Sequence, residues 1–444
     1  MPIFVIANFL LMIVPIFILY RMFKDNFYSV IPIIIPFIGV FSIGISVAYL
    51  EIGVYSPELF LTTSQTGGTI RYVFAINAFL LAYWFFFRLI VSKNWIAYQK
   101  KMLIKKGDNE RINKFIVIIG MGTAILLLSY VPSEVIDSRN LFIAENPSIV
   151  RDFIFKYLPF VGLYLGLAAG LTKSNSTRAA SYTGAILILF ALFGFGHKFS
   201  TLISFIGNFA ISFFVLVKFI PMRRPVFKIE FRAQFIFAII AMLFVFTAGI
   251  IRYINIGELD ATEYLTNRIF ILQGGIWWFT DYEAFYGLHH PGIEGFLDFV
   301  KSIDYDQNLS LIYLMTKAIG TDLTYKIVFI HYGLYTGAFP AIFYEIGGLT
   351  GPVLFSFLSG IVIAVVSGYL VRKLIKRQFI LILVSFNIYL LVIAIMAGGE
   401  FTHIFSIKIV IKFLVLFFLE FIFYMVKNDR NITQLVLTNS LRTN

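Results

Sequence analysis

Residues 349–371 form the longest uncharged apolar segment near the C-terminal end and read LTGPVLFSFLSGIVIAVVSGYLV. It contains no Asp, Glu, Lys or Arg, and it is followed at once by Arg372, Lys373, Lys376 and Arg377. About 20 mainly apolar residues are enough for a helix to cross the hydrocarbon core of a bilayer. The stretch therefore predicts a transmembrane helix that ends in a basic cluster.

The rest of the 444-residue chain has the same character, with 59% hydrophobic and only 14% charged residues, and its mean hydropathy is +0.87. A typical soluble domain is about 25% charged. Ten further stretches are long and apolar enough to span: 2–20, 28–50, 71–91, 115–133, 153–172, 180–196, 199–220, 233–251, 378–397 and 404–426. We expect an all-α polytopic integral membrane protein with about 11 transmembrane helices, and we exclude a soluble enzyme, a disordered chain and a fibrous repeat.

Loop charges predict the orientation of these spans. The six connections assigned to the inner side (21–27, 92–114, 173–179, 221–232, 372–377 and the tail from 427) hold 22 Lys and Arg against 5 Asp and Glu. The outer side holds 10 basic and 18 acidic residues. Cytoplasmic loops carry an excess of basic residues, so we expect the N-terminus outside and the C-terminus inside.

One outer loop, residues 252–348, is far longer than the others and divides the chain into helices 1–8 (1–251), the loop itself, and helices 9–11 with a cytoplasmic tail (349–444). Long loops are usually functional. Asp260 and Glu263 form a capping-box-like helix start, so the loop is expected to contain helical segments. Residues 327–346 are apolar but rich in Gly and polar residues, which favours a re-entrant or surface-lying segment; a full span here would give twelve helices.

Composition and motifs limit the chemistry. Cys is absent, which excludes disulfides and thiolate sites. There is no Walker loop, dinucleotide fingerprint, G-x-S-x-G elbow or H-E-x-x-H motif, so we expect no cofactor and no metal. The net charge of +12 is explained by the inner loops rather than by nucleic-acid binding.

Histidines and arginines of the outer side are the candidate reactive groups. His331 and His403 lie in apolar, Gly-containing stretches at membrane depth, where a titratable group is costly and typical of function. Arg268 lies near the capped helix start, where its guanidinium could bind a phosphate or pair with acidic neighbours. Other basic candidates are Arg252, at the end of a span, Arg139, and the His197-Lys198 turn; anchoring or structural roles remain alternatives for each.

A group of aromatic and acidic residues is a candidate for sugar binding. Trp277, Trp278, Tyr282, Asp281 and Glu283 combine aromatic faces with carboxylates, a pattern that suits sugar rings but also an interfacial aromatic belt.

The last span carries Lys408, Lys412 and Glu420, with Glu400 and His403 just before it. Charges at that depth must face the protein interior, a cavity or one another. They therefore form either a buried ion pair or the floor of a cleft for an anionic lipid headgroup.

Short patches in this arrangement resemble the Wzy-type O-antigen polymerases, which are also called oligosaccharide repeat-unit polymerases. The patches are Ser138-Arg-Asn-Leu-Phe142, Gly196-His-Lys-Phe-Ser200, Asn267-Arg-Ile-Phe with Gln273-Gly, Thr336-Gly-Ala-Phe-Pro340 and Tyr344-Glu-Ile-Gly-Gly348. Some family members carry a repeated R-x10-G pattern in their outer loops. In the outer loops expected here only Arg151 and Gly162 fit it, so the catalytic model built on that pattern does not transfer.

The resemblance implies a GT-C-like, metal-independent glycosyltransferase of the bacterial inner membrane, active on the periplasmic face in O-antigen, lipopolysaccharide or capsule-type polysaccharide synthesis. It would move a growing glycan from undecaprenyl pyrophosphate to a new undecaprenyl-pyrophosphate-linked repeat unit, beside a flippase and a chain-length regulator. On this hypothesis Arg268, Arg139, Lys198, Arg252 and His197 bind the pyrophosphate, and His331, His403 or Glu400 is the base. A glycan ligase is the nearest enzymatic alternative, and a lipid-linked oligosaccharide flippase or other transporter is the main non-enzymatic one.

Overall fold

The structure is a computed structural model in which nearly all regular structure is helical. It describes residues 2–56, 59–103, 110–132, 142, 145–195, 199–219, 271–287, 292–302, 309–330, 338–398, 407 and 409–422. Within these residues the one sheet is a two-stranded antiparallel hairpin, in which Tyr55 pairs with Thr62 and Ser56 with Leu61.

The elements before the long loop are these: α1 (Pro2–Leu11), α2 (Ile13–Asp25), α3 (Phe27–Val30), α4 (Ile34–Leu50), β1 (Tyr55–Ser56), β2 (Leu61–Thr62), α5 (Gly68–Ile90), α6 (Lys93–Leu103), α7 (Glu110–Ser129), α9 (Ile149–Leu171), α10 (Asn175–Gly194) and α11 (Phe199–Phe219). Those that follow are α14 (Leu272–Phe285), α15 (Ile293–Ser302), α16 (Leu309–Ile319), α17 (Thr321–Tyr325), η2 (Lys326–Ile330), α18 (Ala338–Ala341), α19 (Phe343–Gly347), η3 (Gly348–Thr350), α20 (Gly351–Lys376) and α21 (Phe379–Gly398). Residues 409–422 are also helical.

Among the described residues, six helical segments are long and apolar enough to cross a membrane: Ile6–Asp25, Gly68–Ile90, Glu110–Ser129, Ile149–Leu171, Asn175–Gly194 and Phe339–Lys376. Shorter apolar helices accompany them, including Ile34–Leu50, Thr201–Val217 and Phe379–Ala394. The protein is thus an all-α, multi-pass integral membrane protein. The expected count of 11 spans is not confirmed, and the expected span at 233–251 lies outside the described residues.

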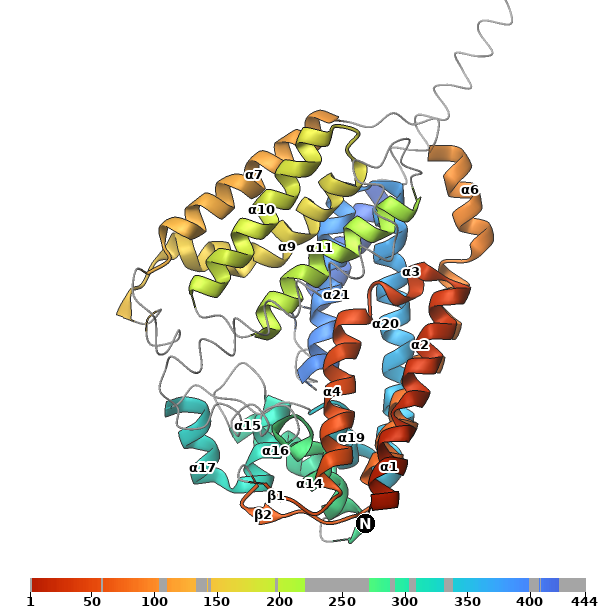
Figure 1. The fold of residues 1–444 in the computed structure, drawn as a ribbon, viewed down its shortest axis with the longest axis vertical. Helices are drawn as coiled ribbons and strands as arrows, with labels where there is room; N and C mark the ends of the chain where they lie inside the picture. Colours follow the sequence, from red (N-terminus) through yellow and green to blue (C-terminus); the bar gives the residue numbers. More distant parts are fainter. Residues whose placement is uncertain are drawn as a thin grey trace, which may run out of the picture.

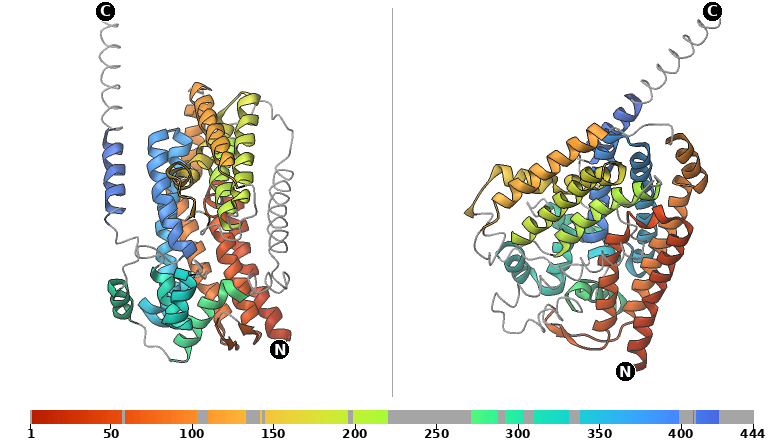
Figure 2. Two further views of the ribbon diagram at one scale, coloured as in Figure 1. Left: turned by 90° about the vertical axis from the view of Figure 1, so that its left-hand side faces the viewer. Right: turned by 45° about the horizontal axis from the view of Figure 1, so that its top comes forward.

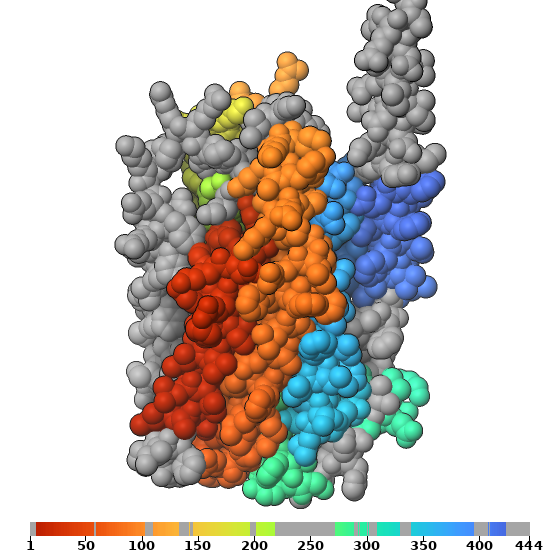
Figure 3. Space-filling view, turned by 90° about the vertical axis from the view of Figure 1, so that its right-hand side faces the viewer, coloured from red at the N-terminus to blue at the C-terminus, as the bar shows by residue number. Residues whose placement is uncertain are grey.

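Helices α5 and α20 pack along each other and lie side by side with α2 on the face shown in Figure 3. Gly360 of α20 lies directly against α5, since a Cβ added there would be 2.4 Å from the backbone oxygen of Phe79. Small residues let helix backbones approach closely, and in membranes such packing replaces the hydrophobic driving force of soluble cores. Gly166 of α9 approaches the backbone of α11 in the same way.

The long loop folds against one end of the bundle. Helices α14–α19 gather there with the β1–β2 hairpin, at the end where the chain starts (Figures 1 and 2). We call this group of helices the cap. The described part of residues 327–346 consists of most of η2 and the short helices α18 and α19. The expected helical segments of the loop are present at 272–285, 293–302 and 309–319.

A second apolar cluster lies to one side of the centre, built from α7, α9, α10 and α11, with Leu127, Leu165, Ile188, Phe195 and Phe205 among its buried residues. Helices α7, α9 and α10 contact one another, and α9 packs along α11. In Figure 1 these four helices form their own layer, inclined to α2, α4 and α20. The bundle therefore has two packed units, and the cap adjoins the one built around α5 and α20.

Replacing Gly360 by Ala is expected to destabilise the protein, because the added methyl must push α20 away from α5. Overpacking of this kind costs about 1–3 kcal/mol. Gly122→Ala in α7 is the matched control, since nothing lies within 4 Å of the Cβ position there. Thermal unfolding in detergent should show a lower midpoint for Gly360→Ala only. Equal midpoints for the two variants would contradict the close approach of α5 and α20.

Candidate functional site

A buried carboxylate joins the cap to the bundle. The side chain of Asp281, on α14, is 0% exposed and pairs with Arg71, in the first turns of α5. Arg71 donates from Nε to Oδ1 and from Nη2 to Oδ2, each at 2.6 Å. Two parallel bonds between guanidinium and carboxylate give the strongest and most directional form of ion pair. The pair therefore fixes the orientation of α14 on the end of α5.

Two hydroxyl groups complete the shell around Asp281. Tyr344, in the helix α19, donates its hydroxyl to Oδ1. Thr66, in the turn before α5, donates to Oδ2 at 3.1 Å. Both oxygens of the buried carboxylate thus accept hydrogen bonds, as a charge taken out of water requires. We call Asp281, Arg71, Tyr344, Thr66 and the neighbouring Glu51 the Asp281 cluster.

Glu51 holds the start of α5 in place. Its buried carboxylate accepts from the backbone N–H groups of Thr66 at 3.1 Å, Gly68 at 2.6 Å and Thr69 at 3.0 Å. Asn8 of α1 adds a bond at 3.0 Å. The first N–H groups of a helix lack partners within the helix and carry partial positive charge, so an anion is favourable there. One side chain therefore satisfies the helix start and connects it to α1.

The turn between β2 and α5 needs its two glycines. Gly67 has φ of +81°, in the left-handed region that glycine adopts without strain. At Gly68 an added Cβ would lie 2.9 Å from Oδ2 of Asp281. Any larger residue at 68 would push Asp281 away from Arg71 or Thr66.

The aromatic residues predicted to bind sugar lie on α14, in the middle of this cluster. Trp277 and Trp278 are buried: Trp277 lies between Tyr72 and Tyr344 with ring centroids 5.1 and 5.0 Å away, and Trp278 donates to the backbone oxygen of Ser64 at 3.0 Å. In this conformation Trp277, Trp278 and Asp281 present their surfaces to protein groups. Their assignment to sugar binding stays a prediction.

The exposed edge of α14 has a different character. Tyr282 is half-buried and stacks on Trp278, and the next turn brings Phe285 and Tyr286 to the surface. Glu283 is also half-buried. The Arg71 guanidinium, 24% exposed, lies 4.5 Å from the centre of the Phe285 ring. An arginine and aromatic rings therefore meet at the surface of the cap, a combination suited to a polar amphiphile with a sugar or phosphate group.

A second buried ion pair lies inside the cap. Lys317 of α16 donates to Oε2 of Glu345 in α19 at 2.7 Å, and the Tyr313 hydroxyl donates to the same oxygen at 3.2 Å. Burial raises the pKa of Tyr313, and the adjacent Glu345 carboxylate raises it further, so this hydroxyl remains a donor. The pair links α16 to α19 and so supports Tyr344, next to Glu345 in the chain.

Most of the other predicted site residues lie outside the described residues. These are His331, His403 and Glu400 among the expected bases, Arg268, Arg139, Lys198, Arg252 and His197 among the expected pyrophosphate ligands, and Lys408. Lys412 is half-buried on the helix 409–422. Glu420, on the same helix, forms an ion pair with Lys373 and a hydrogen bond with Tyr369, both on α20. Of the two alternatives for Glu420, the geometry favours a structural ion pair between helices.

Four residues of the Asp281 cluster were not predicted from the sequence. The sequence did not single out Arg71, Glu51, Thr66 or Tyr344 as a site residue. The available signal was the order Glu51…Thr66-Gly-Gly…Arg71, which places charges on both sides of a glycine turn at the start of a span. Within the described residues, no three His, Asp or Glu side chains group as metal ligands.

Comparison with known proteins gives one match. A model described as "Family of unknown function (DUF6418)" matches residues 304–425, about a quarter of the chain. This region begins inside the cap and contains α16–α21, hence Glu345, Tyr344 and the helix α20 that packs on α5. Neither a curated protein nor a solved structure matches the chain.

Replacing Asp281 by Asn is expected to destabilise the protein, because Arg71 would keep its charge beside a neutral amide. Breaking a fully buried ion pair costs about 3–5 kcal/mol, which is the upper limit here. The partial exposure of Arg71 reduces this cost. A double-mutant cycle with Arg71→Gln, read from thermal unfolding, should give a double variant less destabilised than the sum of the two single variants.

Asp298→Asn is the matched control, because Asp298 is 76% exposed and pairs only across one turn of α15 with Lys301. Exposed pairs contribute little, so its unfolding midpoint should equal that of the wild type. Additive effects of Asp281→Asn and Arg71→Gln would show that the pair does not couple the cap to the bundle.

Proposed function

We propose that this protein is a membrane glycosyltransferase that polymerises lipid-linked oligosaccharide repeat units. The observation that carries the proposal is the cap: the long loop folds into helices anchored on one end of the bundle by the Asp281 cluster. A cap at the membrane surface suits a substrate whose lipid tail remains in the bilayer while its glycan lies in water. The orientation predicted from loop charges puts this end on the outer, periplasmic face.

The placement of chain segments supports a reaction site under the cap. Helix α18 contacts α21 and α14. His331 precedes α18 by seven residues, and Glu400 and His403 follow α21 by two and five residues in the sequence. The elements that lead to the three expected bases are therefore neighbours. We propose that these segments supply the general base at this end of the bundle.

The proposed reaction has simple requirements. A hydroxyl of the acceptor repeat unit attacks the sugar carbon attached to the donor pyrophosphate, the carbon–oxygen bond to that pyrophosphate breaks, and undecaprenyl pyrophosphate leaves. A base, His331, His403 or Glu400, takes the hydroxyl proton, a contribution of about 10²–10⁴ in rate. Arg268, Arg139, Lys198 or Arg252 stabilises the charge on the leaving pyrophosphate. Tyr282 and Glu283 are half-buried on α14, and in the proposed reaction they orient sugars.

A glycan ligase is the second candidate, because it needs the same donor and the same outer site. A flippase is less favoured: substrate sites of many transporters lie near the middle of the membrane, at the interface of repeats. Here the ion-paired residues Asp281, Arg71, Glu345 and Lys317 belong to the cap and to the adjoining end of the bundle.

Deletion of the gene should convert a ladder of surface glycan into a single repeat unit, as read by gel electrophoresis, and the wild-type gene should restore the ladder. Long lipid-linked polymer that accumulates on the outer face would indicate a ligase instead. Lipid-linked single repeats held on the inner face would indicate a flippase. An unchanged ladder would refute a role in glycan assembly.

Arg268→Ala should shorten or abolish the ladder at unchanged protein level, because the leaving pyrophosphate would lose a ligand. Arg111→Ala is the matched control, since Arg111 is exposed at the first turn of α7 and lies in a connection predicted to face the cytoplasm. Normal polymer length in Arg268→Ala cells would remove Arg268 from the proposed site.

A further inference from the structure

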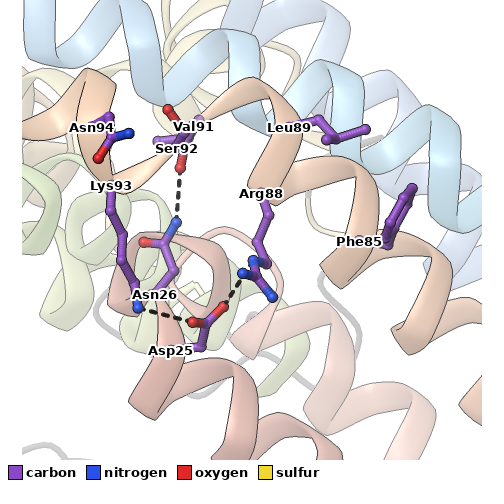
Figure 4. A pocket seen from close by; sticks show the side chains of 9 residues that line it. All are labelled: Asp25, Asn26, Phe85, Arg88, Leu89, Val91, Ser92, Lys93 and Asn94. Carbon is purple, nitrogen blue, oxygen red and sulfur yellow. Dashed lines mark hydrogen bonds and ion pairs between the residues drawn. The ribbon is translucent and has the colours of Figure 1, made fainter.

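The end of the bundle opposite the cap contains a pocket with a volume of about 420 Å³. It lies where α2 ends, α5 ends and α6 begins, and Figure 4 shows its lining: Asp25, Asn26, Phe85, Arg88, Leu89, Val91, Ser92, Lys93 and Asn94. None of these residues belongs to the Asp281 cluster. The pocket is therefore separate from the Asp281 cluster.

Two cations and one carboxylate define its polar side. Arg88 and Lys93 approach Asp25 from different directions (Figure 4), with nitrogen–oxygen distances of 3.2 and 3.0 Å. Trp84 also donates to Asp25, at 3.1 Å. Together, Arg88, Lys93 and Asp25 carry a net charge of +1. The Arg88 and Lys93 side chains are 58% and 67% exposed, so they can bind a further anion while they stay near Asp25.

The other side of the pocket is apolar and faces outward. Phe85 is 61% and Leu89 64% exposed, and both lie on the same face of α5 as Arg88, one turn apart. Helix α5 is a membrane-spanning segment, so these side chains border lipid tails. An anion drawn from water would not use this apolar wall, whereas an amphiphile would contact both sides.

The surroundings add positive charge. Helix α6 begins at Lys93 and carries Lys100 and Lys101 in its last turn, and Arg21 and Lys24 lie near the end of α2. Basic segments next to a span attract anionic lipids, and basic pockets at helix ends bind their headgroups. The field at this end therefore favours an anionic lipid over a zwitterionic one.

We propose that this pocket binds an anionic phospholipid, with the headgroup phosphate held by Arg88 and Lys93 and an acyl chain along Phe85 and Leu89. Asp25 positions the two cations in the empty pocket and limits the affinity, because it competes with the phosphate for them. A bound lipid would connect the ends of α2, α5 and α6.

Native mass spectrometry of the full-length protein in detergent tests this proposal with dioleoyl phosphatidylglycerol, dioleoyl phosphatidylcholine and inorganic phosphate as probes. We expect tighter binding of phosphatidylglycerol than of phosphatidylcholine. The double variant Arg88→Gln/Lys93→Gln should weaken phosphatidylglycerol binding about 30-fold. Lys114→Gln, which removes an exposed cation near the start of α7 and outside the pocket, should change it less than about twofold.

Asp25→Asn should act in the opposite direction and tighten phosphatidylglycerol binding, a gain that misfolding would not produce. Equal binding of the two lipids would overturn the proposal, as would unchanged binding in the double variant. Displacement of phosphatidylglycerol by inorganic phosphate at equal concentration would also overturn it and would indicate a site for a soluble anion. None of these readouts depends on glycan synthesis, so failure here leaves the proposed function untouched.

Discussion

The bidentate bond between Arg71 and Asp281 is the interaction on which the arrangement of the cap depends. It connects the start of α5, which packs along α20, to α14, the first described helix of the cap. Tyr344 ties α19 to the same carboxylate, and the Lys317–Glu345 pair ties α16 to α19. An isolated charge is costly to bury, so each of these side chains restricts where its partners can lie. These polar contacts orient the cap, in addition to the apolar core that Trp277, Phe339 and Phe343 share with the bundle.

Sequence patterns predicted the helical membrane fold because the physics behind them is local. A run such as residues 349–371 must be helical in a bilayer, since no water is present to satisfy its backbone. The number of spans could not be derived in the same way: α4, with 17 residues, is shorter than a typical span, and the described segment 338–350 consists of short helical pieces before α20. Tertiary contacts, such as those of Gly351 with the backbone of Phe343, decide such cases.

The candidate site was predicted only in part. Asp281 and Trp277 were singled out by composition, but their partners come from distant parts of the chain, 210 residues away in the case of Arg71. Pairing at that separation is a property of the folded bundle, and one sequence contains no signal for it. Glu51 is similar: as a cap for α5 it lies 17 residues before Gly68, far beyond the spacing of a local capping motif.

The separation of Arg71 and Asp281 also sets an order of assembly. Ribosomes add about 5–20 residues per second, so roughly 10–40 s pass between synthesis of the two residues. During that time α5 has its Glu51 cap available, while the carboxylate for Arg71 does not yet exist. The end of the bundle next to the cap can therefore close only after α14 and α19 have been synthesised, and until then Arg71 lacks the carboxylate that pairs with it.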